Sequence, residues 1–297
     1  MVDDRRTVLI TGGTKGIGFA TARGLASRGH RVVLTGRVQA ACDDAARAIA
    51  SSASGAQVVG MALDLASLAS VRELARAFLA EGWPLHVLIN NAGQLSLDNT
   101  LRLTGDGIES TLATNAIGPF LLTQLLREAL LRSAPARIVN VSSRVHMPNS
   151  GMAGEVSWDW DNLRGEKSFD PVVSYKNSKL AMMWMTYELD RRLAATGITI
   201  NAVCPGFVPE TLAEHRRGLS RWLYKHVMTH LPGTRTVAQA ADNTLFAATD
   251  PAYATKGGVF IGERKEIPSS DDSYDEAKAK RFWKLACELT GTPEAAT

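Results

Sequence analysis

Short apolar runs rich in β-branched residues alternate along the chain with longer stretches in which apolar residues recur every three or four positions. The short runs have the length and composition of buried strands, whereas the longer stretches have the period of amphipathic helices. Strands are expected over residues 8–11, 31–35, 58–63, 85–90, 136–142, 199–203 and 258–262. Helices are expected over residues 16–28, 38–53, 68–80, 107–132, 172–195, 237–249 and 273–289, the last with Ser273 as N-cap and Glu276 completing a capping box.

The alternation of these elements predicts the fold class. Repeated strand–helix–strand units form parallel sheets with helices on both faces and right-handed connections. We therefore expect an α/β chain with a Rossmann-type, doubly wound parallel sheet, folded as a single domain over residues 1–297. Two irregular segments interrupt it: a polar insert at about 144–171, and a segment at about 205–233 whose bulky apolar residues are typical of a lid over a substrate.

The composition narrows the possible functions. Of 297 residues, 45% are hydrophobic and 21% are charged, as in globular proteins. The net charge of +3 without a lysine or arginine run argues against nucleic acid as a partner, and no apolar stretch is long enough to span a bilayer. Three scattered cysteines and a charged beginning unlike a signal peptide predict a reducing, cytoplasmic location.

A glycine-rich turn joins the first expected strand to the first expected helix. Glycines at such a turn let the backbone approach a pyrophosphate, which then lies at the positive end of the helix. The turn therefore predicts a dinucleotide site. Its expected cofactor contacts are Gly12, Thr14, Lys15, Gly16, Ile17 and Gly18.

The end of the second strand indicates which dinucleotide binds. Rossmann proteins that bind NAD usually carry an acidic residue there for the adenosine ribose, whereas this chain has Gly36 followed by Arg37. Arg37 and Lys15 either are ordinary surface cations or hold the additional phosphate of NADP(H), which suits their charge. We predict NADP(H) as the cofactor.

Further polar positions follow the third and fourth strands, at the carboxyl ends where open α/β sheets bind ligands. Asp64 and Leu65 follow the third strand, and Asp64 either contacts the adenine or caps the next helix. Asn91, Ala92 and Gly93 follow the fourth strand. Both segments are therefore candidates for contact with the dinucleotide.

A candidate for proton transfer comes later in the chain. Ser142 and Ser143 close the fifth strand, and Tyr175 and Lys179 lie one turn apart on one face of the helix after the insert. A phenol beside an ammonium is expected to have a lowered pKa, as a general acid working near neutral pH requires. The pair therefore indicates acid–base chemistry.

Taken in order, these motifs resemble those of the short-chain dehydrogenase/reductase family over nearly the whole chain. The matching features are the glycine-rich turn, Asn90 to Gly93, Asn115, Ser143, Tyr175 with Lys179, and Pro205-Gly206. Three features are similar to the retinol-dehydrogenase-like branch of the family. They are a longer than usual gap between Ser143 and Tyr175 and the amino-acid sequences of residues 161–167 and 274–291. The anchoring segment common in animal members of that branch is not seen, which favours a soluble protein.

The resemblance implies a role for each matching residue. Tyr175 would donate or accept the proton, and Ser143 rather than Ser142 would hold the substrate oxygen. Lys179 would bind the nicotinamide ribose and lower the pKa of the phenol, and Asn115 would support a water linking Lys179 to solvent. The segments implied to border the cofactor are Asn91, Ala92 and Gly93 beside it, and Pro205, Gly206 and Val208 at the nicotinamide. Where the family often has a threonine after its Pro-Gly pair, this chain has Glu210 and then Thr211, so a contact to the carboxamide is not implied.

Other residues suggest no sharper function. His226 and His230 share helical spacing, but the residues between them supply no glutamate, so no metal is expected. The aromatic residues of the two irregular segments either line an apolar pocket or anchor loops; they are Trp158, Trp160, Trp222 and Tyr224.

These observations lead to one main hypothesis and two alternatives. We expect an NADP(H)-dependent oxidoreductase that moves a hydride between nicotinamide and the carbonyl or alcohol group of a fairly large apolar molecule of retinoid, steroid or polycyclic kind. Its expected state is a monomer or homodimer. The alternatives are a tailoring ketoreductase of secondary-metabolite biosynthesis and a non-catalytic NADP(H)-binding regulator, against which the intact set of candidate catalytic residues argues.

Overall fold

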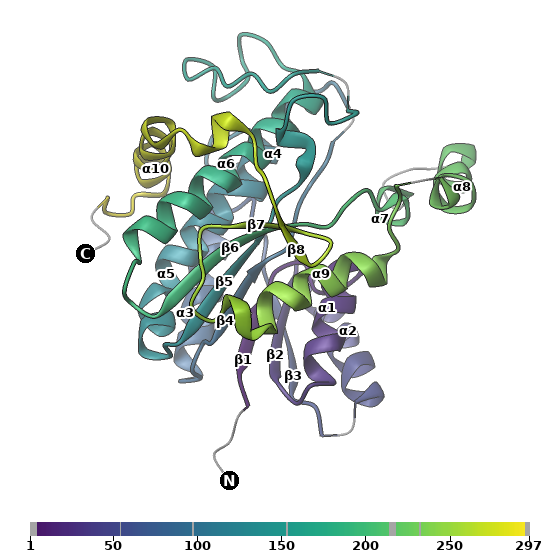
Figure 1. Cartoon of the computed structure of the whole chain (residues 1–297), viewed down its shortest axis with the longest axis vertical. Helices are drawn as coiled ribbons and strands as arrows, with labels where there is room; N and C mark the ends of the chain where they lie inside the picture. Colours follow the sequence, from purple (N-terminus) through teal and green to yellow (C-terminus); the bar gives the residue numbers. More distant parts are fainter. Residues whose placement is uncertain are drawn as a thin grey trace.

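The computed structural model describes residues 5–53, 55–96, 98–152, 154–213, 218–231 and 233–294. A single sheet passes through the centre of the molecule, with helices on both of its faces (Figure 1). Its strands are β1 (Thr7–Ile10), β2 (Arg31–Gly36), β3 (Val58–Ala62), β4 (Val87–Asn90), β5 (Ala136–Val141), β6 (Ile198–Cys204), β7 (Phe260–Gly262) and β8 (Lys265–Ile267). The longer helices are α1 (Gly16–Ala26), α2 (Gln39–Ser52), α3 (Leu68–Ala80), α5 (Gly118–Arg132), α6 (Pro171–Arg192), α9 (Val237–Thr249) and α10 (Glu276–Thr290).

The strand order confirms the expected fold class. The eight strands lie in the order β3-β2-β1-β4-β5-β6-β7-β8, and all pairs are parallel except β7 with β8. From β1 the chain first builds outward to β3 and then returns to place β4 on the other side of β1. The carboxyl ends of β1 and β4 are thus the point where the winding reverses, which is where open α/β sheets bind ligands.

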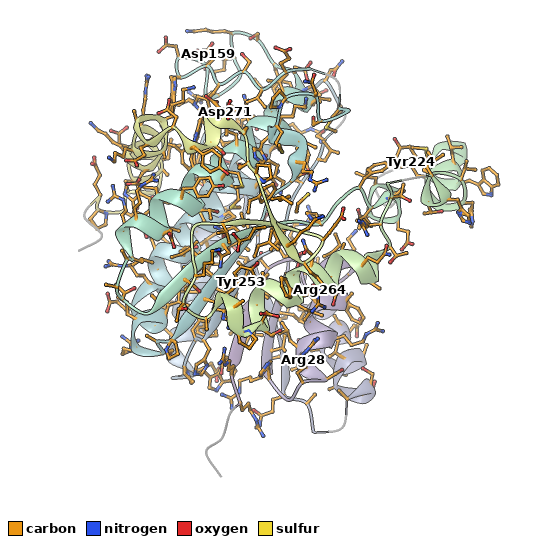
Figure 2. The ribbon with its side chains drawn as sticks, in the orientation of Figure 1. Arg28, Asp159, Tyr224, Tyr253, Arg264 and Asp271 are labelled. Carbon is orange, nitrogen blue, oxygen red and sulfur yellow. The ribbon has the colours of Figure 1, made fainter. Side chains whose placement is uncertain are left out.

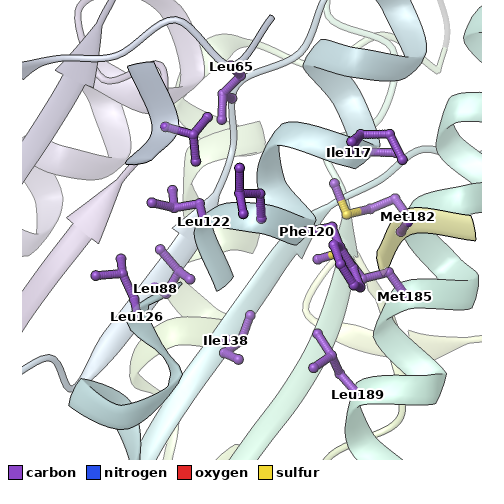
Figure 3. Close-up of a cluster of buried hydrophobic side chains, with 14 of the residues drawn as sticks. Leu65, Leu88, Ile117, Phe120, Leu122, Leu126, Ile138, Met182, Met185 and Leu189 are labelled. Carbon is purple, nitrogen blue, oxygen red and sulfur yellow. The ribbon is translucent and has the colours of Figure 1, made fainter. Parts of the chain in front are cut away.

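Both faces of the sheet are buried because its strands are apolar at consecutive positions. Along β1, Leu9 points into one buried cluster while its neighbours Val8 and Ile10 point into another, as the alternation of a strand requires. The first cluster joins the sheet to α3, α5, α6 and α10; Figure 3 shows part of it, with Phe120 between the strand residue Ile138 and Met182 of α6. The second cluster joins the sheet to α1, α2 and α9.

The last helix covers the outer side of α5 and α6. Trp283 of α10 packs edge-on against Phe120 of α5, with ring centroids 4.9 Å apart. The expectation that Ser273 caps this helix is wrong: the helix begins at Glu276, and its N-cap is Asp275, whose carboxylate accepts the Lys278 N–H at 3.0 Å. Ser273 lies in a preceding 3-10 turn (Asp271–Tyr274) and donates to the Ser270 carbonyl.

The expected helix over 107–132 is interrupted. Three residues of α4 (Ser110–Leu112) lead into a π-helix (Ala113–Ile117), and α5 follows at Gly118. π-helical turns inside helices occur frequently at functional sites. The turn here contains Asn115, which is fully buried.

The segment at 205–233 is not wholly irregular. It contains α7 (Pro209–Ala213), α8 (Gly218–His226) and a 3-10 turn (Met228–His230). The pairing of Phe207 with Thr234 closes its base, and from there α7 and α8 project away from the sheet, with Tyr224 near the tip (Figures 1 and 2). No helix in the described part of the chain is both long and apolar enough to cross a membrane.

Candidate active site

The glycine-rich turn after β1 is shaped by close backbone contacts. Gly12 has a φ of +67°, which favours glycine, and a Cβ on Gly18 would lie 2.1 Å from the Gly12 carbonyl oxygen. Helix α1 can therefore begin this close to β1 because residue 18 has no side chain. The result is an open cradle of backbone at the N-terminus of a helix, of the kind that accepts a pyrophosphate.

The end of β4 is tied to this turn by side chains. The amide of Asn91 donates to the Thr11 carbonyl at 2.8 Å, and Thr11 Oγ1 accepts the backbone N–H groups of Asn91 and Ala92 at 3.0 Å each. A Cβ on Gly12 would lie 3.0 Å from Ala92. The structure therefore brings the two predicted cofactor segments together. Thr11 was missed in the sequence because a buried threonine at the end of a strand has no distinguishing pattern.

The two predicted phosphate-binding cations lie at the corner between β1 and β2. The N–H of Gly13 donates to the Thr35 carbonyl at 2.8 Å, and a Cβ on Gly36 would lie 2.6 Å from the methyl group of Thr14. Lys15 follows Thr14 as the N-cap of α1, and Arg37 follows Gly36; both side chains are exposed. The corner therefore presents the cations Lys15 and Arg37. The contact between Thr14 and Gly36 lies between them and leaves no room for a side chain at residue 36.

Asp64 does not cap α3. The N-cap of that helix is Ser67, whose hydroxyl accepts the Ser70 N–H at 3.3 Å, whereas the Asp64 carboxylate accepts the Ala66 N–H at 3.0 Å. The helix-cap alternative for Asp64 is thus wrong. Leu65 is buried in the core, so of the two residues Asp64 alone offers a side chain at the carboxyl end of β3.

Tyr175 and Lys179 lie on one face of α6, near the end of β5. The Lys179 ammonium donates to the Val141 carbonyl at 3.0 Å and lies 5.7 Å from the centre of the Tyr175 ring. Helix α6 is fixed at its start by Asp170, whose carboxylate accepts the N–H groups of Val172 and Val173. The pair is therefore held by the helix and by the last residue of a central strand.

Burial shifts the pKa of both groups. Desolvation raises the pKa of Tyr175 to about 12, and desolvation also lowers the pKa of Lys179 to about 8. The expectation of a lowered phenol pKa is therefore wrong for this structure, because loss of hydration on burial, to which the neighbouring Cys204 adds, raises the pKa instead. In this arrangement Tyr175 is a neutral phenol, and Lys179 changes its charge near pH 8.

The two serines after β5 have different environments. Ser142 is 1% exposed and donates its hydroxyl to the Lys179 carbonyl at 3.0 Å. Ser143 is half-buried, and its hydroxyl accepts the Val145 N–H at 3.4 Å at the start of a 3-10 turn (Arg144–His146). The hydroxyl of Ser142 is thus committed to the fold, whereas that of Ser143 still has a proton to donate.

Asn115 connects the π-helix to the other candidate residues. Its amide donates to the Gln94 carbonyl and to the Ser178 hydroxyl, each at 2.9 Å, and its oxygen accepts the Gln94 N–H at 2.6 Å. A Cβ on Gly93 would lie 3.4 Å from the Lys179 ammonium and 3.7 Å from Asn115. Asn115, Lys179 and the segment after β4 therefore meet at one place.

The segment after β6 lies above the glycine-rich turn. Val208 is buried, while Gly206 adopts a φ of +81°, at which a Cβ would lie 2.8 Å from the Arg235 side chain. The methyl group of Thr211 faces Gly16, 3.5 Å from the position of a Cβ there, and its hydroxyl donates to the Val208 carbonyl at 2.8 Å. Glu210 is exposed. Thr211, not Glu210, is thus the residue of this loop that faces the turn.

The aromatic residues of the insert serve as anchors and also border a cavity. Trp158 and Trp160 pack against the buried Trp184 of α6, with ring centroids 5.0 and 5.8 Å apart. They also line a cavity of about 740 Å³ that His146 borders, whereas its described lining includes neither Ser143 nor Tyr175. Trp222 lies on the projecting α8, where its ring contacts His226 of the same helix and 55% of its surface is exposed.

The amino-acid sequence is similar to those of known proteins. The family model described as short chain dehydrogenase matches residues 6–154. Retinol dehydrogenase 11 and retinol dehydrogenase 12 of Homo sapiens are 37% and 38% identical over 288 and 286 residues, covering 97% and 96% of this chain and 86% of each relative.

Solved structures give the same relationship. An uncharacterized protein from Mycobacterium paratuberculosis is 33% identical, with a TM-score of 0.73 over 98% of this chain and 95% of the other. The RhlG/NADP active-site complex from Pseudomonas aeruginosa is 25% identical, with a TM-score of 0.68 over 86% of this chain and 94% of the other. In each case most of both chains is aligned, so the likeness extends over the fold as a whole.

Proposed function

Since the chain belongs to the short-chain dehydrogenase family and resembles retinol dehydrogenases over nearly its whole length, we propose that it interconverts carbonyl and alcohol groups of fairly large apolar molecules with NADP(H). The family and its relatives make the chain an oxidoreductase that acts on CH–OH and C=O groups. The cofactor identity, the class of substrate and the roles of single residues are the parts that we propose.

The observation that carries the proposal is how Lys179 holds α6 against the end of β5. Its ammonium donates to the Val141 carbonyl and lies beside the Tyr175 ring, and its backbone carbonyl accepts from Ser142, the residue before Ser143. Gly93 leaves room beside the same ammonium. We propose that the Tyr175 phenol, the Lys179 ammonium and the Ser143 hydroxyl act together at the carboxyl ends of β4 and β5, where ligands of open α/β sheets bind.

The residues of the chain suit NADP(H) at this place. Gly12 and Gly18 leave no room for a Cβ within the turn, so its backbone stays close-packed at the helix N-terminus, and Lys15 and Arg37 would flank the adenosine ribose at the adjoining corner. A phosphate monoester carries a charge of roughly −1.5 to −2 at neutral pH, which two cations stabilise. A related structure solved with NADP supports the same choice. Bound NADP(H) supplies the hydride.

The side chains would manage the proton and the oxygen. The Ser143 hydroxyl would donate to the substrate oxygen and hold it toward Tyr175, which, as a neutral phenol, would donate a proton to that oxygen during reduction. The Lys179 ammonium would stabilise the phenolate that remains, and Asn115, through the Gln94 backbone, would keep the neighbouring segment in place. In the direction of oxidation each proton would move the opposite way.

The proposed substrate class rests on two observations. Two relatives are named retinol dehydrogenases and another polyprenol dehydrogenase, so proteins similar to this one act on long apolar alcohols. The lid expected over 205–233 carries Phe207, Trp222 and Leu223 with exposed apolar surface. A lid of this kind would surround an apolar molecule and exclude water from the reaction. The state of assembly, monomer or homodimer, and a cytoplasmic location stay predictions.

One experiment tests the proposed function. The purified chain is mixed with NADPH and a panel of aliphatic, aromatic and polycyclic ketones and retinal, and the fall in NADPH absorbance is followed. We expect turnover with the larger apolar carbonyls and little with acetone-sized ones. NADPH that binds but is oxidised by no carbonyl, together with NADP⁺ that is reduced by no alcohol, would favour a non-catalytic regulator instead.

A further inference from the structure

A buried histidine lies directly behind Ser143. His146 ends the 3-10 turn that Ser143 begins, is 1% exposed, and packs its ring edge-on against Phe260 of β7 at a centroid distance of 5.3 Å. None of the roles discussed so far uses this ring. Burying a polar ring costs free energy unless its nitrogens have hydrogen-bond partners, so the partners of this ring indicate what it does.

Both ring nitrogens of His146 are engaged. Nδ1 bonds to the Ser143 carbonyl oxygen, and Nε2 lies 2.8 Å from the hydroxyl of Ser269 and 3.5 Å from the N–H of Ser270. A carbonyl can only accept, so Nδ1 carries the proton and Nε2 accepts from Ser269. Desolvation lowers the pKa of His146 to about 4, which keeps the ring neutral in this tautomer.

His146 thus forms a bridge between Ser143 and Ser269, and the Ser269 end of this bridge is itself held in place. The Ser273 hydroxyl lies 2.5 Å from that of Ser269 and can donate its one proton either to Ser269 or to the Ser270 carbonyl, and the backbone N–H of Ser269 donates to the hydroxyl of Tyr274 at 3.0 Å. Tyr274 in turn stacks on Tyr187 of α6, with ring centroids 5.1 Å apart. The segment before α10, more than a hundred residues away in sequence, is thus a fixed support for the histidine.

We propose that His146 is a positioning residue for Ser143, joining the Ser143 carbonyl to the fixed segment at Ser269 and so holding the turn that aims the Ser143 hydroxyl. This inference rests on the proposed function. The orientation of that hydroxyl depends on the turn, because it accepts the N–H of Val145, which belongs to the same turn. Residues that hold a reacting group in its productive orientation affect turnover without contacting substrate.

Substitutions can separate the two ends of the bridge. In His146→Asn the side-chain amide nitrogen takes nearly the place of Nδ1, so the bond to the Ser143 carbonyl is kept and that to Ser269 is lost. In His146→Gln the terminal amide takes nearly the place of Nε2, so the opposite holds. His146→Phe keeps the ring and loses both bonds. His86, whose Nδ1 accepts the Thr7 N–H at the opposite end of the sheet, provides a matched control as His86→Phe.

The experiment measures kcat, the KM for NADPH and the melting temperature of each variant, with Ser143 intact and with Ser143→Ala. We expect His146→Phe, His146→Gln and His146→Asn each to lower kcat about tenfold or more while the KM for NADPH changes less than about twofold, because each variant leaves at least one end of the bridge unjoined. In the Ser143→Ala background His146→Phe should give no further loss, because both changes act through one hydroxyl. His86→Phe should lower the melting temperature and leave kcat unchanged.

The outcomes distinguish this inference from the proposed function. Equal proportional losses of kcat from His146→Phe with and without Ser143 would show that the histidine acts independently of the serine, and the positioning role would be overturned. So would His146→Phe at wild-type kcat, or either amide variant, His146→Asn or His146→Gln, at wild-type kcat. If the phenylalanine variant does not fold, Ser269→Ala removes the support from the other side and is compared in the same two backgrounds. A wild-type protein without turnover would remove the proposed function and, with it, the role of His146.

Discussion

The ammonium of Lys179 lies 5.7 Å from the centre of the Tyr175 ring, one helical turn further along α6. The ammonium donates to the Val141 carbonyl at 3.0 Å, which fixes it beside this ring. Under the proposed function, the charge of Lys179 is therefore the property that its pH dependence tests.

The charge of Lys179 predicts how activity depends on pH. Desolvation lowers its pKa to about 8, so the ammonium is complete at pH 6 to 7 and is lost as pH rises through 8. Tyr175, with a pKa of about 12, remains protonated over this range. We expect kcat/KM for ketone reduction to be level below pH 7 and to fall about tenfold per pH unit above 8. A pH–rate profile that stays level to pH 10 would remove Lys179 from this role.

Arg37 is expected to set the preference for NADPH. Arg37→Ala should lower kcat/KM for NADPH about tenfold to a hundredfold and change that for NADH less than twofold, because a charge-assisted contact is worth about 1.5–3 kcal/mol. The matched control is Arg47→Ala, which removes an exposed arginine of α2 that pairs with Asp44. Assays of both cofactors at fixed low salt decide the matter: an unchanged ratio in Arg37→Ala, or a wild type that prefers NADH, would show that this corner has been misread.

The complementary change at Gly36 is less informative than the sequence suggests. A carboxylate there would be expected to favour NAD by contacting its ribose. However, a Cβ on Gly36 would lie 2.6 Å from Thr14 and 3.3 Å from the sulfur of Cys42, so Gly36→Asp would displace the glycine-rich turn itself. Gly36 is required by packing as well as by any choice of cofactor, and Arg37 is the cleaner position to change.

His146 predicts a pH-dependent part of the stability. Its pKa is about 4 when folded and about 6.5 when unfolded, so between these values the unfolded chain binds the additional proton. Stability from this group is therefore complete above pH 6.5 and is lost as pH falls toward 4, by about 3 kcal/mol in all. Urea unfolding at several pH values should show the wild type losing its advantage over His146→Asn across this window. Burial and the charge of Arg6 also lower the pKa of His86, but His86 is present in both proteins, so its contribution to the difference cancels. A difference that does not vary with pH would contradict the assignment.

The projecting α7 and α8 are expected to behave as a lid. Trp222 is 55% exposed and Leu223 41% exposed, which is unfavourable for apolar side chains unless a ligand or partner covers them. With NADPH and a poorly reacting ketone bound, amide exchange in residues 218–226 should slow about tenfold or more relative to the free protein, while α9 stays unchanged as a reference. Equal exchange with and without both ligands would rule out closure.

The sequence predicted the layout of this fold because most strands are short apolar runs that end close to a glycine or a polar residue. It did not predict β8, a short and mostly exposed edge strand with little apolar pattern, nor the π-helix around Asn115, where the apolar periodicity continues through the change of helix type. The N-cap predicted at Ser273 is wrong because α10 begins only at Glu276, where the Asp275 carboxylate accepts the Lys278 N–H.

The sequence also predicted part of the candidate site. Residues such as Tyr175 and Lys179, one helical turn apart, share a local signal that the sequence carries on its own. His146 gave no such signal, because its partner Ser269 lies far along the chain and joins it by folding alone. The raised pKa of Tyr175 could not be predicted either, since it depends on how deeply the phenol is buried rather than on which residue stands four positions later.

The most direct test of the proposed chemistry is kcat of Tyr175→Phe for the best carbonyl substrate, measured beside the dissociation constant for NADPH. Phenylalanine keeps the ring on α6 and removes the one proton that Tyr175 is proposed to transfer. We expect kcat to fall about a hundredfold or more while NADPH binding and the melting temperature stay near those of the wild type. Turnover within about threefold of the wild type would contradict the assignment of Tyr175 as the proton donor, and with it the central claim about this site.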